Sequence, residues 1–427
     1  MSRDFRANKN LICVSANAKE TAINTEQTLD TTLRVSVDTI FNLKPRRETN
    51  ADEQTGKEEP DTIYKLGALT EAPLTYPKAM PQHFGFVYGY GLGAVSSAAW
   101  GTGYKHTITP IESMYPPGFT AAGRYGKTVG KRRFASNYID SATSEFAKDS
   151  WLKLSTTVAG TGKYTNSVSI ENVTAAYDAT SLTLAGTNIV QGSTAAERLD
   201  NVHRIRVQDV TDGQWVEVSF SAVSAGNPGV TPSNITISAP GGVVTSTTYE
   251  ITYVATEAAW ATFPAIVTES PLRVTDLVLK IGGKWNGSAF LGGRTLAAEI
   301  NSVSYNLQNQ LSVEFRVGGT GDYANYVVRK GRMQTLTLNR EMRDFILQRH
   351  LEDNEYFGVY MKATGDEFES GKNYYVEMVF PRCGVIEAPI SVSDKVNVEA
   401  GNLQVLEDDT YGSVWMQVAN KVATYAA

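Results

Sequence analysis

The sequence predicts a mainly β protein of the α+β class, in which most residues lie in antiparallel sheets. Two observations carry this prediction. The composition combines 21 Tyr, 36 Gly and a hydrophobic fraction of 42% with many Thr, Ser and Val residues, which favour strands over helices. Several segments also alternate apolar and polar residues with a period of two, the pattern of a strand with one buried face.

The length of 427 residues predicts one large domain with an insertion, or two domains. Residues 165–255 are rich in Ser, Thr, Ala and Val and contain the short β runs VHRIRVQDV, QWVEVSF, SNITISA and TTYEITYV. Turn clusters separate these runs, a pattern typical of a small β-sandwich. We interpret this segment as an inserted Ig-like module between a first part, 1–164, and a second part, 256–427. A pair of elaborated hairpins belonging to the main domain is the alternative.

Charge and cysteine content argue against several classes of protein. The net charge of -6 disfavours a protein that grips nucleic acid by neutralising phosphates, although passive contact stays possible. Cys13 and Cys383 are too few for a disulfide scaffold and lack metal-ligand spacing, which favours a reducing compartment. The N-terminus has no apolar core of signal-peptide length, and no run of 18 apolar residues occurs. We expect synthesis in the cytoplasm and no membrane insertion.

The first sixty residues predict an arm, a strand and a charged loop. Residues 1–30 are polar and weakly patterned, which predicts an extended arm ordered only by partners. The segment 31–43 alternates well enough for one long strand. A loop, 44–61, follows; most such charge runs are simply solvated and mobile, but this one could pair with a neighbouring copy. Its charged candidates for that contact are Lys44, Arg46, Arg47, Asp52, Glu53, Glu58 and Glu59.

A short packed helix is predicted between Pro77 and Ala99. Apolar residues recur there at helical spacing despite several glycines. Gly89, Gly91 and Gly93 superficially resemble a nucleotide loop, but their spacing is GxGxG and no strand precedes them, so a nucleotide site is not expected.

The stretch from Arg332 to Pro381 predicts strand, helix, strand, acidic turn and strand. In RMQTLTL, Leu336 and Leu338 share one face, which indicates a half-buried strand. A helix is expected from Arg340 to Asn354, with Asn339 as its N-cap and Asn354 at its C-terminal stop.

That helix would carry two apolar stripes. Met342, Phe345 and Ile346 form the first, which we expect to pack on the chain's own sheet. Leu347 and Leu351 form the second, which is spare unless a second subunit covers it. We therefore expect Leu347 and Leu351 at a subunit interface, with burial in the chain's own core as the alternative.

No enzyme is expected. The four histidines are scattered and none lies beside a plausible nucleophile or metal-ligand partner: His83, His106, His203 and His350. Paired carboxylates, which glycoside hydrolysis needs, occur at Asp408 with Asp409 and near Asp366. Both groups lie in predicted turns, where solvated acids are common. The sequence predicts no catalytic residue, metal or cofactor.

Several segments together resemble the tail tube proteins of long-tailed bacteriophages. They are a compact Gly-rich helix, the strand GYKHTI at 103–108, the Pro-rich PIESMYPPG, a hairpin around Tyr305, Asn306 and Asn309, the strand 335–338 running into a helix, a strand closing on FPRC at 380–383, and QVLEDDTYGSVWMQVAN at 404–420. The resemblance covers roughly the first 160 and the last 170 residues, as an order of elements and not as one signature motif. It implies an antiparallel β-sandwich domain with a flanking helix that forms a barrel on assembly.

The resemblance further implies a structural role in the virion tail. Six copies would form a ring, and rings would stack into a hollow tube that conducts DNA during ejection; assembly would take place in the host cytoplasm. Partners would be other copies, the tape measure, the tail terminator, baseplate or tip proteins, and transiently passing DNA. Joining sheets between subunits would also remove exposed strand edges.

The expected channel lining is the polar face of a hairpin. In EINSVSYNL and LSVEFRV the apolar residues share one side, and we expect these two runs to pair. A negative lumen would repel phosphate and let DNA slide. An ordinary solvent-facing sheet is the alternative. The predicted lumen-facing residues are Ser302, Ser304, Asn306, Ser312, Glu314, Arg316 and, from YYVEMVF, Glu377.

A cell-surface or carbohydrate-binding β protein is the alternative function. Numerous Tyr and Trp residues suggest it, as do the sequons at Asn172, Asn234 and Asn286. Those sequons matter only in a secreted protein, and a signal peptide is lacking. Fractionation of the producing cell would separate the two functions.

Overall fold

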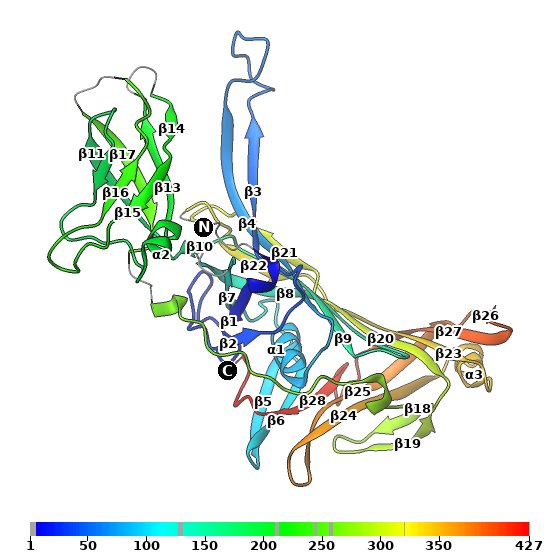
Figure 1. Cartoon of the computed structure of the whole chain (residues 1–427). Helices are drawn as coiled ribbons and strands as arrows, with labels where there is room; N and C mark the ends of the chain where they lie inside the picture. Colours follow the sequence, from blue (N-terminus) through cyan, green and yellow to red (C-terminus); the bar gives the residue numbers. More distant parts are fainter. Residues whose placement is uncertain are drawn as a thin grey trace. The chain divides into compact units, whose positions relative to one another are not determined.

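The computed structural model describes residues 6–126, 131–209, 213–242, 246–255, 259–319 and 321–426. It confirms the mainly β class, because antiparallel sheets dominate and the helices are few and short (Figure 1). The chain divides into two compact units, each described below by itself. The main unit comprises Ile12–Ala121, Phe134–Lys163 and Pro264–Ala427; the module unit comprises Met1–Leu11, Ala122–Arg133 and Tyr164–Phe263.

The module unit contains two antiparallel sheets around a hydrophobic core of its own. One sheet has the order β11–β17–β13–β14 and the other β12–β16–β15. The alternation in VHRIRVQ buries Val202, Ile205 and Val207, which meet Tyr249 and Ile251 in the core. The elements are β10 (Tyr164–Asn166), β11 (Ser169–Ala175), β12 (Ser181–Thr183), α2 (Ala195–Asp200), β13 (Val202–Gln208), β14 (Trp215–Glu217), β15 (Phe220–Val223), β16 (Asn234–Ile237) and β17 (Thr247–Tyr253), with 3-10 turns at Ala7–Lys9 and Ala259–Ala261.

The remaining elements build the main unit, although β1, β7 and β8 begin or end in the module unit. The strands are β1 (Leu11–Val14), β2 (Thr31–Leu33), β3 (Asn42–Thr49), β4 (Ile63–Tyr76), β5 (Gly93–Trp100), β6 (Gly103–Pro110), β7 (Phe119–Arg124), β8 (Lys131–Ala147), β9 (Lys153–Gly160), β18 (Leu277–Trp285), β19 (Phe290–Thr295), β20 (Ile300–Gln308), β21 (Leu311–Glu314), β22 (Tyr326–Arg329), β23 (Met333–Glu341), β24 (Tyr356–Glu369), β25 (Lys372–Glu387), β26 (Ile390–Ser393), β27 (Val396–Leu406) and β28 (Trp415–Asn420). The helices are α1 (Pro81–Leu92) and α3 (Ile346–Glu352), with a 3-10 turn at Val274–Asp276.

The strands of the main unit form two antiparallel series of neighbouring, hydrogen-bonded strands, which we call the first and the second ladder. The first has the order β3–β4–β9–β8–β20–β23–β27–β26. The second has the order β19–β18–β24–β25–β28–β6–β5. They join at β25, whose residues from Tyr375 to Val379 pair with β28 and whose residues from Arg382 to Glu387 pair with β27. Both ladders turn their apolar side chains toward one hydrophobic core.

The predicted packed helix is α1, and all twelve of its residues are buried. Pro81 occupies its first position, where a missing N–H costs nothing, and Gly93 ends it at a φ of 100°. A Cβ on Gly85 would lie 2.3 Å from the Tyr425 ring, so this glycine allows the C-terminal segment to pack against the helix. The glycines of α1 therefore serve close packing. The expectation that no strand precedes them is wrong, because β4 ends at Tyr76, shortly before α1 begins at Pro81, but Gly89 and Gly91 lie within the helix and Gly93 ends it, so none lies in the connecting loop.

The N-terminal predictions were partly wrong. Residues 1–5 of the predicted arm lie outside the described residues, but β1 pairs with β2, and Ile12, Cys13 and Val14 are buried. The arm is thus held by its own chain. The single long strand expected over 31–43 is two elements, β2 and the start of β3.

The helix expected from Arg340 to Asn354 is shorter. The strand β23 continues to Glu341, so Asn339 pairs with Ala400 in a ladder and caps no helix. The C-terminal stop was placed correctly, because Asn354 adopts a left-handed φ of 50° just after α3. Leu336 and Leu338 are buried on one face of β23, as predicted.

Candidate assembly surfaces

The predicted hairpin between EINSVSYNL and LSVEFRV is wrong. The strand β20 pairs with β23 and β8, whereas β21 pairs with β22. A left-handed φ of 44° at Gln310 turns the chain out of the ladder between them. The predicted lumen residues therefore lie in three separate places. Their assignment to a channel stays a prediction.

The first group is part of a polar sheet face. Val303, Tyr305 and Leu307 are buried, which leaves Ser302, Ser304 and Asn306 on the outer side, as the alternation predicted. Cross-strand neighbours extend this side over five strands. One row is Ser155, Thr143, Asn306, Thr335 and Gln404, and the next is Lys153, Glu145, Ser304, Thr337 and Asn402. We call these two rows the polar sheet face.

The polar sheet face consists almost entirely of hydroxyl and amide groups. The Thr143 hydroxyl donates to the Asn306 side chain at 3.2 Å across the β8–β20 pair. Its only charges are one lysine and one glutamate, which lie opposite each other at Lys153 and Glu145. The rows therefore carry no net charge.

The second group lies around the β21–β22 hairpin. The Ser312 hydroxyl donates to Glu314 at 2.8 Å, and Arg316 lies 2.8 Å from the same carboxylate. Arg316 also lies over the Tyr326 ring, 3.3 Å from its centroid. Hydrogen bonds from the Ser312 hydroxyl and then from the Arg316 guanidinium lower the pKa of Glu314. Because this carboxylate is paired with an arginine, it adds no net negative charge to a channel.

The third group is Glu377 in β25, on the outer side of the other ladder. Lys362 lies opposite in β24, and its Nζ is 2.9 Å from the Glu377 carboxylate. On the same side, Lys105 lies over Trp100 at 4.2 Å and Lys280 over Tyr360 at 5.7 Å. This face therefore carries more cations than anions, which disagrees with a negative channel lining.

The segment predicted as a charged loop is strand only at its start, where residues 44–49 belong to β3; residues 50–61 connect β3 to β4. Figure 1 shows β3 and β4 as a long two-stranded arm that extends beyond β9, the next strand of the first ladder. Lys44, Arg46 and Arg47 lie within β3, so the loop prediction is wrong for them. Lys44 pairs with Glu71 at 2.8 Å, while Arg46 lies 5.5 Å from the Phe315 ring centroid.

The tip of this arm, residues 50–62, holds the acidic part of the predicted loop. Asn50 orders it: its side-chain oxygen accepts the backbone N–H of Asp61 at 3.1 Å and of Thr62 at 3.2 Å. The Tyr64 hydroxyl donates to Glu53 at 2.8 Å. Five carboxylates and one lysine give the tip a net charge of -4; they are Asp52, Glu53, Lys57, Glu58, Glu59 and Asp61.

The expected division of α3 into two stripes is wrong in part, although Ile346 packs against the chain's own core as expected. Leu347 is fully buried in the chain's own core, and Leu351 packs against that core. The expectation that these leucines are left over for a neighbour is therefore wrong for Leu347. Phe345 was expected to pack on the chain's own sheet, but it is 65% exposed. It lies at the N-cap position before α3 and not on the helix face that meets the core.

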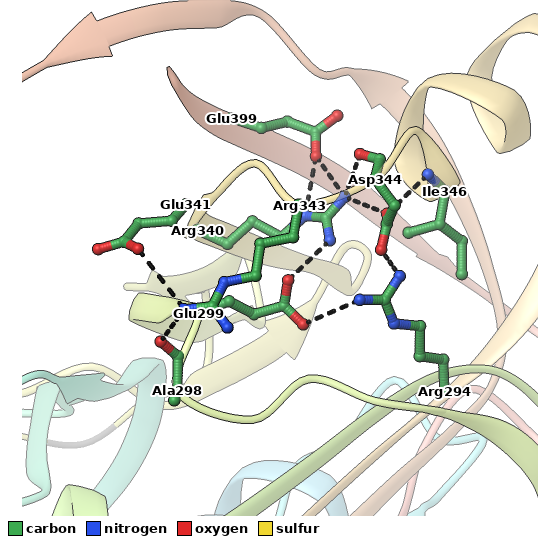
Figure 2. Close-up of polar contacts among 9 residues, drawn as sticks. All are labelled: Arg294, Ala298, Glu299, Arg340, Glu341, Arg343, Asp344, Ile346 and Glu399. Carbon is green, nitrogen blue, oxygen red and sulfur yellow. Dashed lines mark hydrogen bonds and ion pairs between the residues drawn. The ribbon is translucent and has the colours of Figure 1, made fainter. Parts of the chain in front are cut away.

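A buried ion network holds the turn between β23 and α3 (Figure 2). Arg340 has no exposed surface, and its Nε lies 2.8 Å from Glu399 on the adjacent strand β27. Its other nitrogens reach Glu299 at 3.3 Å and Asp344 at 2.9 Å. Arg294 binds both Glu299 and Asp344 from the other side. Arg340 was predicted to lie on a helix, and no local signal could reveal partners 41 and 59 positions away.

Sequence reasoning also missed Glu269, which lies at the N-terminus of α1. Its carboxylate accepts the backbone N–H of Gln82 at 2.9 Å and of Lys421 at 3.4 Å. Burial raises the pKa of Glu269 to about 7, against the lowering effect of these hydrogen bonds. Beside it, the His83 ring accepts the Met80 N–H at 3.2 Å, and burial lowers the pKa of His83 to about 3.

The histidines and acids show no metal-ligand grouping in the described part of the chain. His106 lies between Ser97 and Asn420, at 2.8 and 3.1 Å, and His350 lies 3.0 Å from Glu355. Asp408 accepts the N–H groups of Thr410 and Tyr411, so it orders a turn. Each of these contacts has a structural explanation.

No protein-family model and no curated protein sequence matches the chain. Within the described residues, no helix has both the length and the apolar character that crossing a membrane requires.

Proposed function

We propose that this chain is a structural subunit of a bacteriophage tail tube, in which hexameric rings stack into a hollow tube that conducts DNA. The observation that carries the proposal is the first ladder of the main unit. It presents the polar sheet face over five strands, and within the described residues its end strands, β3 and β26, each pair with one neighbour. Such edges invite pairing with another chain, and ring closure would satisfy them.

The polar sheet face suits a channel lining. Non-specific DNA binding comes from cations that displace counterions from phosphates. A face of hydroxyls and amides with no net charge offers few such contacts, so DNA could slide along it. This departs from the negative lumen expected from the sequence, since Glu314 and Glu377 are both neutralised by neighbouring cations. In this proposal Ser302, Ser304 and Asn306 line the channel.

The β3–β4 arm suits ring stacking. Its stem carries a net charge of +2 from Lys44, Arg46, Arg47 and Lys65 against Glu48 and Glu71, and its tip carries -4. The tip of one copy would complement the stem of a copy in the next ring. Opposite charges of this kind fix register and orientation more than they add affinity.

The Ig-like character of the module is also a proposal. Seven strands in sheets of four and three support it. The first strand of the module, β11, pairs with the last, β17, which departs from the usual pairing of the first two strands. The fold alone gives the module no ligand.

Negative-stain electron microscopy of the purified full-length protein tests the proposed function. Rings or hollow tubes of uniform width are expected, together with a concentration-dependent rise in mass by light scattering. A protein that stays monomeric up to millimolar concentration and shows neither rings nor tubes would contradict it.

A further inference from the structure

The hairpin β26–β27 presents apolar side chains that its own chain leaves uncovered. Ile390 is 47% exposed and Val392 is 70% exposed. Both lie on the hairpin face that also carries Glu399, and α3 covers the base of this face, where Gln348 donates to Glu399 at 2.8 Å. We call Ile390 and Val392 the apolar shelf.

The two-residue turn of this hairpin consists of one acidic and one basic residue. Asp394 and Lys395 both adopt left-handed φ values, 49° and 66°, where glycine or asparagine would be easier. A two-residue hairpin turn requires positive φ at both positions, so the turn itself accounts for these values. Neither side chain forms an ion pair or hydrogen bond with another of the described residues.

A complementary feature exists elsewhere on the main unit. An apolar cleft of about 690 Å³ is open to solvent, and its lining includes Trp151, Leu277, Leu279, Leu296 and Ile300. Its lining also includes Lys148, Asp149 and Arg273. Arg273 pairs with Asp276, whereas the side chains of Lys148 and Asp149 form no ion pair or hydrogen bond with other described residues. Asp149 and Ala298, which also lines the cleft, have left-handed φ values of 57° and 56°.

We infer that the apolar shelf of one copy docks into the Trp151 cleft of a second copy, with Asp394 facing Lys148 and Lys395 facing Asp149. The charges match in order, and each partner supplies what the other lacks: exposed apolar side chains and an apolar cleft. Shelf and cleft are different surfaces, so the contact is head-to-tail, and it closes into a ring when the rotation between copies allows. The inference rests on the proposed function, for which it names the contact between adjacent subunits.

The buried ion network makes the docking surfaces rigid. Ile300 at the cleft pairs with Arg340, Arg340 pairs with Glu399, and Glu399 pairs with Ile390 on the shelf. The Arg340–Glu399 contact thus fixes the strands that carry both surfaces. A preformed surface loses less conformational freedom on association.

Sedimentation velocity on shelf variants of the full-length chain tests the inference. Val392→Asp should weaken self-association at least about tenfold, because it places a charge in an apolar contact. Val317→Asp, at a fully exposed apolar position of the same unit, is the matched control and should associate like the wild type. Equal association of Val392→Asp and the wild type would overturn the inference.

A charge exchange tests the register. Asp394→Lys and Lys148→Asp should each weaken association by about two- to fivefold, the range for exposed ion pairs. Combined in one chain they should restore it, since the two charges are then exchanged across the contact. A double variant that associates more weakly than either single variant would refute the pairing.

Two further measurements separate the possible failures. Replacing both Asp394 and Lys395 by Gly should raise monomer stability while it weakens association, so reduced assembly could not be ascribed to misfolding. Rings that form normally with Val392→Asp would reject this contact but keep the tube function. A wild-type chain that never associates would reject both.

Discussion

At the scale of single residues, Leu347 and Phe345 exchange the roles that their spacing suggests. Leu347→Ala should destabilise the protein by about 2–5 kcal/mol, because it removes a fully buried side chain and leaves a cavity. Phe345→Ala should change the free energy of unfolding by less than about 0.5 kcal/mol, since its side chain is mostly exposed. Urea unfolding of both variants measures the difference, and equal losses would contradict the placement of Phe345 outside the core.

Glu269 should make stability depend on pH. Its pKa is raised from 4.5 to about 7 by burial, so the folded state keeps the proton longer than the unfolded state. Its contribution is full below pH 4.5 and is lost as the pH rises to about 7; at 1.36 kcal/mol per pH unit this loss is about 3 kcal/mol. Glu269→Gln should therefore gain stability over the wild type between pH 5 and pH 8.

The control for this prediction is Glu59→Gln, at an exposed position of the arm tip. Its stability difference from the wild type should not change with pH. Thermal melts across the range give both differences. A Glu269→Gln variant whose difference from the wild type stays constant would show that the buried carboxyl remains ionised.

At the scale of elements, the sequence predicts alternation well and partners poorly. The buried faces of β20 and β23 follow from a period of two, because one side of each strand meets the core. The prediction of a hairpin that joins β20 to β21 was wrong, because β20 pairs with β8 and β23, and residues far away in the chain decide that pairing. The predicted start of α3 at Arg340 was wrong for a related reason. Arg340 alternates as a buried strand residue only because Glu299 and Glu399 neutralise it, and local spacing contains no sign of that network.

The network that ends β23 should be costly to break from one side. Arg340→Met removes the cation that Glu399 and Glu299 share and leaves carboxylates buried, at a cost of about 3–5 kcal/mol. Arg349→Met breaks an exposed pair with Glu352 and should cost less than about 1 kcal/mol. Urea unfolding at pH 7 compares the two. A small loss for Arg340→Met would mean that the buried carboxylates of Glu399 and Glu299 do not depend on the Arg340 cation.

At the scale of the whole molecule, the β3–β4 arm should control tube length without controlling folding. Replacing Ala51–Pro60 by a two-residue Asn-Gly turn keeps Asn50, Asp61 and both strands but removes most of the tip charge. Monomer stability should be nearly unchanged, because the tip contributes little to the core. Electron microscopy should then show rings and few long tubes. Tubes of normal length would exclude the tip from stacking.

The orientation of the polar sheet face is the decisive property of the proposed tube, and two pairs of lysines can determine it. Ser304 and Thr337 are cross-strand neighbours on the polar sheet face, and Ser96 and Thr107 are cross-strand neighbours on the outer side of the other ladder. Replacing both members of either pair by Lys adds the same charge to each subunit, so non-specific attraction for DNA is matched.

If the polar sheet face lines the channel, tubes of the first variant should hold a short DNA duplex at low salt, protect it from nuclease and release it as the salt concentration rises. Tubes of the second variant should bind duplex that stays sensitive to nuclease, because it lies outside. The opposite result would mean that the polar sheet face lies on the outside of the tube. It would place the lysine-rich face in the channel, where its cations would hold phosphate and slow the passage of DNA.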